Sequence, residues 1–578
     1  MRTRFAPQLI SGPRRAMLGR LVGIGVAQAV LTLSSAWLVH AFFDHAVQGR
    51  DVASAATGLI AALIASGGAL AWFKTVERIQ AERMGQHYAA ELRLALFDGL
   101  AAQSPRRLQS RSRGGTLLRF MGDVKGVRRW VSLGLPRLAV GALSAVIALL
   151  ALAVVDPWLT VSAVSGFALS GIALAWLTMR VEPAVRESRR RQARLAADVN
   201  DRIAAIAVVQ VFDQVEREKR RLGRQSEALA NAMVDQMRGV SLLRSAAEFG
   251  GALASALVLF AGAVEVGRGM LEAADVVGAL TVVGLIAPAF RDLGQVLGYW
   301  RTATVSLDKI DEFLAAPRLS TRSEGEESPR LPRRGRAVSV SFRDVSVGEA
   351  LQGFTAHARA GRKIAIVGPN GSGKSTVLGL VARMLDADQG EVRVAGHAVQ
   401  EYPLSRLRAR LGVVTPDLPL LRGSIERNLV YRKPRAGHDE RSRVESMCGV
   451  DELLQTLPRG GLTRVAEGGG NLSYGQRQRI AWARALLGQP GLLLLDEADA
   501  NLDPASASRL GEVLADYAGT VLMVTHHLAR VMQADEVWFL DGGRLVEKGA
   551  PQELMGRVSR TRQLFRAEAR TTQGECAA

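Results

Sequence analysis

Cysteine is nearly absent from this chain of 578 residues, which has only Cys448 and Cys576. Two thiols so far apart exclude a disulfide framework and give no metal-site pattern. Acidic residues are also in deficit, 55 against 74 lysines and arginines, which gives a formal net charge of +19. Such an excess is typical of nucleic-acid-binding proteins, or of membrane proteins whose cytoplasmic loops are rich in arginine and lysine.

Long apolar runs decide between these two classes. Hydrophobic residues make up 48% of the chain and are concentrated in its first half, whereas the second half is patterned like a soluble α/β domain. A membrane span needs about 20 apolar residues. The first run is too long for the apolar part of a signal peptide, so we expect it to be a retained span. The sequence predicts six spans, of which the third and sixth are short: 21–43, 52–73, 138–155, 158–179, 246–266 and 276–290.

The spacing of the spans predicts their topology. Spans two and three are separated by 64 residues and spans four and five by 66, whereas the other connections are short. Within the long intervals, apolar residues recur at helical spacing beside charged faces. Basic residues precede the first span and follow the fourth, so the N-terminus and both intervals are expected in the cytoplasm. Six spans argue against a soluble nucleic-acid-associated protein, and we expect no nucleic-acid partner.

The segment 317–336 is charged, contains proline and is poor in apolar residues, as linkers are. It divides the chain into an expected transmembrane domain at 1–316 and a second domain at 337–570, followed by a tail at 571–578.

The first functional motif of the second domain is a glycine-rich loop. It fits the phosphate-loop pattern G-x-x-x-x-G-K-[ST], with an apolar β-branched run before it and a helical pattern after it. Its backbone N–H groups would hold phosphate oxygens, its lysine would reach the β- and γ-phosphates, and its serine would bind Mg²⁺. The other interpretation, an ordinary strand-to-helix turn, does not explain why every fixed position matches. The expected nucleotide-binding residues are Gly368, Pro369, Asn370, Gly371, Ser372, Gly373, Lys374, Ser375 and Thr376.

Two carboxylates follow the leucine-rich run 492–495. A buried strand would deliver Asp496 to the edge of a parallel sheet where ligands bind, and there it would help to hold Mg²⁺. Glu497 would then orient and deprotonate the attacking water.

Further segments carry a family resemblance. Leu472, Ser473, Tyr474, Gly475 and Gln476 resemble the LSGGQ signature of the ATP-binding cassette (ABC) superfamily. Asp503 matches that family's D-loop, and His526 matches its switch histidine. The resemblance implies that His526, Glu497 and Lys374 are the catalytic residues. With six spans ahead of the cassette, the whole chain resembles exporter-type half-transporters.

This resemblance implies a fold and a function. The fold class would be a six-helix all-α transmembrane domain of the exporter type, followed by an α/β P-loop ATPase domain. The protein would be an ATP-driven exporter or flippase in the cytoplasmic membrane, using ATP and Mg²⁺. It would act as a dimer with a second copy or a homologous half-transporter, surrounded by membrane lipid. A weakly active nucleotide-binding half of a heterodimer and an exporter-shaped importer are the alternatives, and the sequence does not identify the substrate.

Three positions depart from the family pattern. Pro416, followed by Asp417, stands where the family usually has a glutamine that touches Mg²⁺ and the attacking water. Tyr474 replaces a glycine of the signature. The residues ahead of the phosphate loop, 348–350, include no aromatic side chain to stack on adenine.

Ionisable residues in or beside spans are candidates for a transport cavity. His40, Glu248, Arg291 and Asp292 are the candidates here. The alternative is that they lie at span ends and face water.

Overall fold

The computed structural model describes residues 5–9, 11–47, 52–109, 113–317, 319, 329–500, 502 and 504–566. The chain forms two compact units. The first, here called the membrane unit, comprises Met1–Ala101 and Arg111–Ala316, and the second, the cassette unit, comprises Ala102–Ser110 and Pro317–Ala578. A short segment from the first half of the chain thus belongs to the cassette unit, which the sequence did not predict.

Six helices of the membrane unit are long and apolar enough to cross a membrane, as the sequence predicts. The longest has 53 residues and is about 80 Å long at 1.5 Å per residue, whereas the hydrocarbon core of a bilayer is about 30 Å thick. The long helices are α1 (Pro13–Val47), α2 (Val52–Ala101), α6 (Leu135–Val155), α7 (Pro157–Ala204), α9 (Val215–Gly267) and α10 (Ala273–Leu314). The short ones are α4 (Arg113–Leu118), α5 (Val124–Arg129) and α8 (Ile206–Val211), with π-helical turns at Arg119–Asp123 and Trp130–Gly134.

The tight connection between α6 and α7 follows from two residues. Asp156 leaves the helical conformation, and its carboxylate accepts a hydrogen bond from the Leu159 backbone N–H at 2.8 Å. Pro157 occupies the first helical position, where its missing N–H costs nothing. One capping residue and one proline therefore end one span and begin the next.

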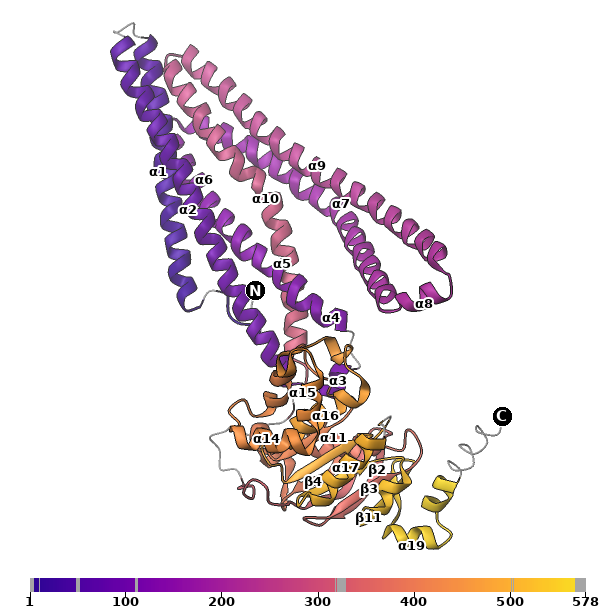
Figure 1. Ribbon diagram of the computed structural model, residues 1–578. Helices are drawn as coiled ribbons and strands as arrows, with labels where there is room; N and C mark the ends of the chain where they lie inside the picture. The colour runs from indigo at the N-terminus through magenta and orange to yellow at the C-terminus, as the bar shows by residue number, and fades with distance from the viewer. Residues whose placement is uncertain are drawn as a thin grey trace. The chain divides into compact units, whose positions relative to one another are not determined.

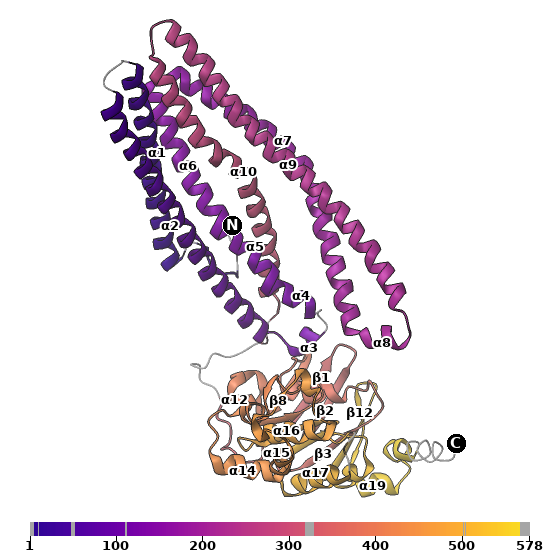
Figure 2. The same cartoon turned by 45° about the horizontal axis from the view of Figure 1, so that its top comes forward.

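Helices α7 and α9 run side by side as a hairpin closed by α8, and toward α8 this hairpin separates from the other helices of the unit (Figures 1 and 2). Small residues bring the two helices together. A Cβ atom at Gly166 would lie 2.5 Å from the Ala254 Cα, and one at Gly250 would lie 2.4 Å from the Ser170 hydroxyl. Close backbone approach of this kind is how membrane helices associate without a hydrophobic driving force between them.

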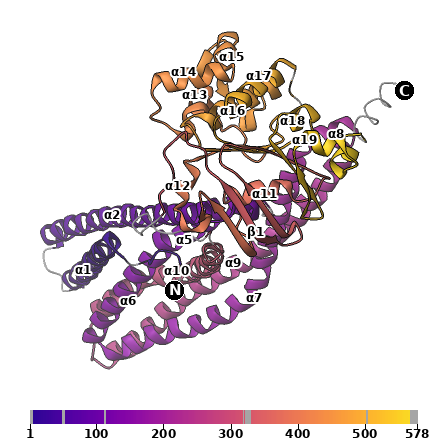
Figure 3. The same ribbon diagram turned by 90° about the horizontal axis from the view of Figure 1, so that it is seen from below.

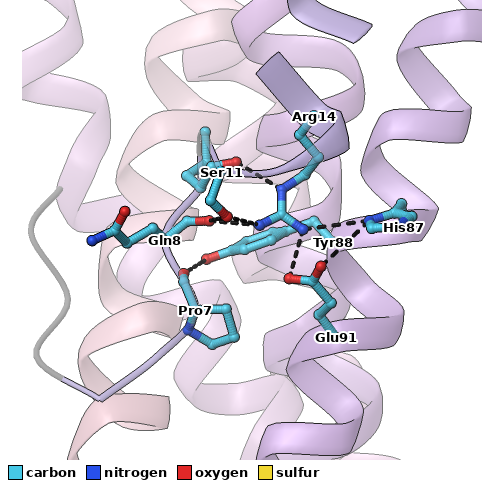
Figure 4. A network of polar contacts seen from close by, with 8 residues as sticks. Pro7, Gln8, Ser11, Arg14, His87, Tyr88 and Glu91 are labelled. Carbon is cyan, nitrogen blue, oxygen red and sulfur yellow. Dashed lines mark hydrogen bonds and ion pairs between the residues drawn. The ribbon is translucent and has the colours of Figure 1, made fainter. Parts of the chain in front are cut away.

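The segment before α1 is tied to α2 by a polar network (Figure 4). Arg14 is 1% exposed and forms an ion pair with Glu91 at 2.6 Å. The same guanidinium donates hydrogen bonds to the backbone carbonyls of Gln8 and Leu9, and the Tyr88 hydroxyl donates one to the Pro7 carbonyl at 2.8 Å. The network satisfies carbonyls that would otherwise be buried without donors.

The cassette unit contains a six-stranded sheet in the order β12-β11-β3-β10-β9-β6, in which the last five strands are parallel. Alternate residues of its buried strands face two separate cores, as the period of two requires. Its strands are β3 (Lys363–Val367), β6 (Leu411–Val414), β9 (Leu492–Asp496), β10 (Thr520–Val524), β11 (Glu536–Asp541) and β12 (Arg544–Gly549). This confirms the predicted α/β domain.

A second, antiparallel sheet has the order β2-β1-β4-β5, and a two-stranded ribbon pairs β7 with β8. Their bounds are β1 (Val340–Val347), β2 (Leu351–Ala358), β4 (Gln389–Val394), β5 (His397–Ala398), β7 (Gly423–Ser424) and β8 (Arg464–Val465).

Helices α13 to α17 gather in one group, away from α11, α12 and β1 (Figure 3). The helices of this unit are α3 (Pro105–Gln109), α11 (Lys374–Val381), α12 (Leu404–Arg408), α13 (Ile425–Leu429), α14 (His438–Met447), α15 (Val450–Thr456), α16 (Tyr474–Leu486), α17 (Pro504–Asp516), α18 (Leu528–Met532) and α19 (Pro551–Gly556).

The network around Arg14 gives a stability prediction. Arg14→Gln should lower the free energy of unfolding by about 1–3 kcal/mol, because buried carbonyls and a carboxylate lose their donor. Thermal unfolding of the full chain in detergent measures it. Arg20→Gln, an exposed arginine on the same helix, is the control and should change stability by less than about 0.5 kcal/mol. Equal effects of the two substitutions would contradict the prediction.

Candidate nucleotide site

The parallel strands bring the site's groups to one edge of the sheet. Val524 of β10 pairs with Ile366 of β3 on one side and with Asp496 of β9 on the other, and Leu495 pairs with Val414 of β6. The four strands therefore end at nearly the same level. The loops that follow them carry the phosphate loop, His526, Glu497 and Asp417 side by side.

Two glycines of the phosphate loop have no possible substitute. Gly368 has a φ of +147° and Gly373 a φ of +95°, which residues with a side chain rarely adopt. A Cβ atom at Gly373 would lie 2.2 Å from the Ala350 carbonyl oxygen, so the turn between β1 and β2 packs directly on the loop. That turn is where the family resemblance leads one to expect an aromatic side chain.

The Lys374 side chain lies inside the phosphate loop. Its ammonium donates hydrogen bonds to the carbonyls of Gly368 and Pro369 at 2.9 and 2.8 Å. Burial lowers the pKa of Lys374, while the carboxylates of Glu497 and Asp496 oppose that shift. The Lys374 ammonium thus already lies where phosphates would bind, and these two backbone carbonyls hold it there.

Ser372 is a second residue of the phosphate loop that indicates phosphate binding. The side chain is 3% exposed, and its hydroxyl is buried without a hydrogen-bond partner in the part of the chain that the structure describes. A buried hydroxyl without a partner is destabilising, and a phosphate oxygen in the loop would satisfy it.

The residues expected to hold Mg²⁺ are together. The Ser375 hydroxyl is hydrogen-bonded to the Asp496 carboxylate, and both line a small cavity at the base of the loop. Burial raises the pKa of Asp496, and the hydrogen bond from Ser375 opposes the rise. One hydroxyl and one carboxylate are hard oxygen donors of the kind that Mg²⁺ shares with nucleotide phosphates, so this donor set fits the ion.

Glu497 and His526 form a pair on neighbouring strand ends. The Glu497 Oε1 lies 3.5 Å from the His526 Nε2. Glu497 has a φ of +49°, which is unusual for a residue with a long side chain, and its N–H donates to the Val524 carbonyl at 3.0 Å. Strain of this kind is concentrated at functional sites, where surrounding structure holds it.

The signature residues begin α16. Ser473 accepts a hydrogen bond from the Gln476 N–H at 3.2 Å, and the Gln476 side chain accepts one from the Ser473 N–H at 2.9 Å. This capping box uses the serine hydroxyl within its own helix. Ser473, Gly475 and Gln476 all line one hollow beside α15.

Tyr474 needs no glycine-like backbone. It is the first residue of α16, and its φ is negative. Its hydroxyl accepts from the Gln478 side chain at 3.0 Å, and the Arg477 guanidinium lies 5.6 Å from its ring centre. The tyrosine is therefore held against its own helix.

Asp417 lies beside the metal ligands, although Pro416 occupies the glutamine position. It lines the same cavity as Ser375 and Asp496, and its charge raises the pKa of Asp496. Asp417 is therefore a third acidic group at the site, beside Asp496 and Glu497.

The predicted D-loop residue, Asp503, lies outside the described residues. Nearby, the Thr525 hydroxyl donates to the Asp499 carboxylate at 2.6 Å, which links the segment after β9 to the residue before His526.

Arg106 is a residue that the sequence analysis missed. Its guanidinium donates to the Thr376 hydroxyl at 2.7 Å, next to the phosphate loop, and the Ser104 hydroxyl donates to the Met384 carbonyl at 2.5 Å. Both lie in the segment that joins the cassette unit directly after α2. No motif in the sequence signals these contacts.

Of the four cavity candidates, the structure pairs only Glu248 with Arg291 among the described residues. His40 Nε2 lies 3.0 Å from Asp275 Oδ1, and Glu248 forms ion pairs with Arg244 and Arg291 at 3.1 and 3.6 Å. Of the four, only Asp292 lines the cavity between α1, α2, α6 and α10.

A phosphate loop, an acidic strand end and a carboxylate–histidine pair, in a chain with six potential spans, define a membrane-spanning P-loop ATPase. Comparison with family models gives the family. Residues 21–288 match the ABC transporter transmembrane region, and residues 351–500 match the ABC transporter ATPase family. The chain belongs to the ABC transporter family, as a multi-pass membrane protein that binds ATP, and it has the organisation of an exporter-type half-transporter.

Known proteins agree with this assignment. The chain is 25% identical to an ATP-dependent lipid A-core flippase of Syntrophus aciditrophicus, over 82% of this chain and 79% of that one. It is 30% identical to a multidrug efflux ATP-binding/permease protein of Mycobacterium bovis, but spans only 42% of that protein's length. It is similar to the structure of a bacterial Atm1-family ABC exporter with ATP bound, with a TM-score of 0.84, 25% identity and coverage of 96% of this chain and 99% of that one.

The position of Asp417 gives a second prediction. Asp417→Asn should weaken the apparent Mg²⁺ affinity in ATP hydrolysis by about five- to tenfold, equivalent to about 1–1.4 kcal/mol, because a nearby negative charge is removed. A magnesium titration of the ATPase rate measures it. Asp516→Asn removes an exposed charge elsewhere in the same unit and should leave the titration unchanged. An unaltered magnesium dependence in Asp417→Asn would show that the carboxylate takes no part.

Proposed function

We propose that this protein is one half of an ABC exporter in the cytoplasmic membrane, with its N-terminus and its cassette in the cytoplasm. The observation that carries the proposal is the Glu497–His526 pair beside a complete phosphate loop, in a chain that also has six potential spans. A chain that only bound nucleotide would have no need to hold Glu497 in a strained conformation. ATP hydrolysis would drive substrate outward through the membrane unit.

Each residue of the site would have its own role in ATP hydrolysis. Lys374 would exchange the carbonyls of Gly368 and Pro369 for phosphate oxygens, with little movement. Ser375 and Asp496 would hold Mg²⁺, which when bound neutralises charge on the phosphates. Glu497 would orient water for attack on the γ-phosphate and accept its proton. His526 would contact the same phosphate and keep the glutamate in place.

A second cassette would complete each site. The N-terminus of α16 presents the backbone N–H groups of the signature, and such a helix end attracts anions. In exporters of this fold, the protein works as a dimer, and the signature of one cassette faces the nucleotide of the other. A second copy of this chain is the partner that needs no further assumption.

Covalent continuity would couple hydrolysis to transport. Helix α2 ends at Ala101, and the next residues belong to the cassette unit, where Arg106 contacts Thr376. Thr376 follows the phosphate loop directly. Closure of the cassettes around ATP would therefore act on α2 through a short, hydrogen-bonded segment, and alternating access would result from two arrangements of the helices.

The heterodimer alternative also has support. Pro416 has no side chain that could contact Mg²⁺ and water as a glutamine would, and Tyr474 occupies a signature position with its hydroxyl turned to its own helix. These features favour a half that binds ATP and pairs with a more active chain. Purification of the chain alone distinguishes the two: a stable, hydrolysing homodimer excludes the alternative.

The central prediction is that Glu497→Gln abolishes hydrolysis but not ATP binding. The rate in lipid nanodiscs should fall by about 10²–10⁴-fold, the contribution of a general base, while nucleotide remains bound. Measurement of Mg·ATP hydrolysis and of ATP binding in parallel tests it.

Glu512→Gln, an exposed glutamate on α17, is the matched control and should retain full activity. A Glu497→Gln variant that hydrolyses ATP like the wild type would refute the assigned role. No hydrolysis by the wild type, with ATP still bound, would favour the heterodimer.

A further inference from the structure

We infer that the membrane unit binds an anionic amphiphile in a cavity whose charged end contains Lys74 and Arg78. This inference rests on the proposed function, because it names the class of substrate that the exporter would carry. The cavity has a volume of about 480 Å³ and lies between α1, α2, α6 and α10.

The lining of the cavity differs from one end to the other. Charged side chains of three helices line the cavity in two groups: Glu77 of α2 accepts a hydrogen bond from Gln28 of α1 at 2.9 Å, and Arg137 of α6 lies 3.8 Å from Asp292 of α10. Leu70 lies about 12 Å further along α2 from Arg78, at 1.5 Å per residue. Ala148 lies about 16 Å further along α6 from Arg137. Beyond the charged end the lining is therefore mainly small and apolar.

The charges at the charged end do not cancel. Glu77 keeps its negative charge while it accepts the hydrogen bond from Gln28, and Arg137 is engaged by Asp292 and by the Gln295 side chain at 3.0 Å. Three cations and two carboxylates line the cavity, so one net positive charge remains. Lys74 and Arg78 form no hydrogen bond or ion pair with any of the residues that the structure describes. They are four residues apart on α2, so they project from the same face of the helix and repel each other.

A bound anion would relieve this repulsion. Lys74 and Arg78 directly follow the predicted span 52–73, and both side chains are exposed where they line the cavity. An arginine guanidinium matches carboxylate and phosphate geometry with two parallel hydrogen bonds, and a lysine adds a point charge beside it. A cationic amphiphile would instead be repelled by the same pair.

Ser132 provides an independent observation at the same end. It lines the cavity, is 3% exposed, and its hydroxyl has no hydrogen-bond partner among the described residues. It lies in the π-helical turn Trp130–Gly134, and such turns are frequent at functional sites. The cavity thus offers two free cations and a free hydroxyl to an anionic head group, and an apolar region to its chain.

The experiment compares four ligands that share one alkyl chain. Binding of dodecyl phosphate, dodecanoate, dodecyl maltoside and dodecyltrimethylammonium to the full chain is measured in phosphatidylcholine nanodiscs. The wild type should prefer an anionic ligand over the uncharged one by at least tenfold. Lys74→Gln combined with Arg78→Gln should abolish that preference and change binding of the maltoside by less than twofold. Preference for the phosphate or for the carboxylate identifies the head group.

A charge-matched control and a reversal keep the test specific. Lys219→Gln with Arg238→Gln removes two exposed cations from α9 and should leave all four affinities unchanged. Lys74→Glu with Arg78→Glu should shift the preference to the ammonium ligand. Equal weakening of all four ligands, or a wild type that prefers the ammonium ligand, would overturn the inference.

Basal ATP hydrolysis separates this inference from the proposed function. If the wild type hydrolyses ATP and Glu497→Gln does not, but Lys74→Gln with Arg78→Gln binds dodecyl phosphate and dodecanoate like the wild type, only the inference fails. If the wild type does not hydrolyse ATP but prefers the anionic ligands through Lys74 and Arg78, the hydrolysing homodimer of the proposed function fails and the inference stands.

Discussion

The parallel pairing of β3, β10, β9 and β6 fixes where every group of the nucleotide site lies. Because parallel strands run in the same direction, their carboxyl ends meet at one edge, and ligands bind there. The phosphate loop, His526, the two carboxylates and Asp417 are spread over 159 positions of the sequence, from Gly368 to His526. The strands are buried on both faces, and a slip of one residue would move each leucine and valine into the opposite core, which is packed for other side chains.

The same constraint explains what the sequence could predict. The phosphate loop, the acidic strand end and the signature are contiguous motifs in which each residue's neighbours define its context, so Lys374, Asp496 and Ser473 could be placed from pattern alone. The six spans were equally predictable, since a helix in lipid must satisfy its own backbone and needs a long apolar run. Span ends were less so, because α2, α7 and α9 continue as helices well beyond their apolar parts.

Contacts between distant segments were not predictable. Nothing local indicates that Arg106 contacts Thr376, 270 residues away, or that Arg14 is buried against Glu91. The direction of the Tyr474 ring was not predictable either, because contacts within α16 decide it. Among the candidate cavity charges, position near a span end could not distinguish Asp292, which lines the cavity, from His40, whose partner is Asp275.

Buried polar groups without a hydrogen-bond partner occur in both units. A folded chain normally gives each buried polar atom a partner, because a missing hydrogen bond costs stability. Ser372 in the phosphate loop and Ser132 in the membrane unit are two exceptions among the described residues. Ser372 shares its loop with Lys374, and Ser132 lines the same cavity as Lys74 and Arg78. In the cassette unit the ammonium of Lys374 donates to backbone carbonyls, whereas Lys74 and Arg78, just beyond the span 52–73, have no such partner among the described residues. A transporter that is stabilised by its own substrate can use that free energy to favour the conformation that closes around it.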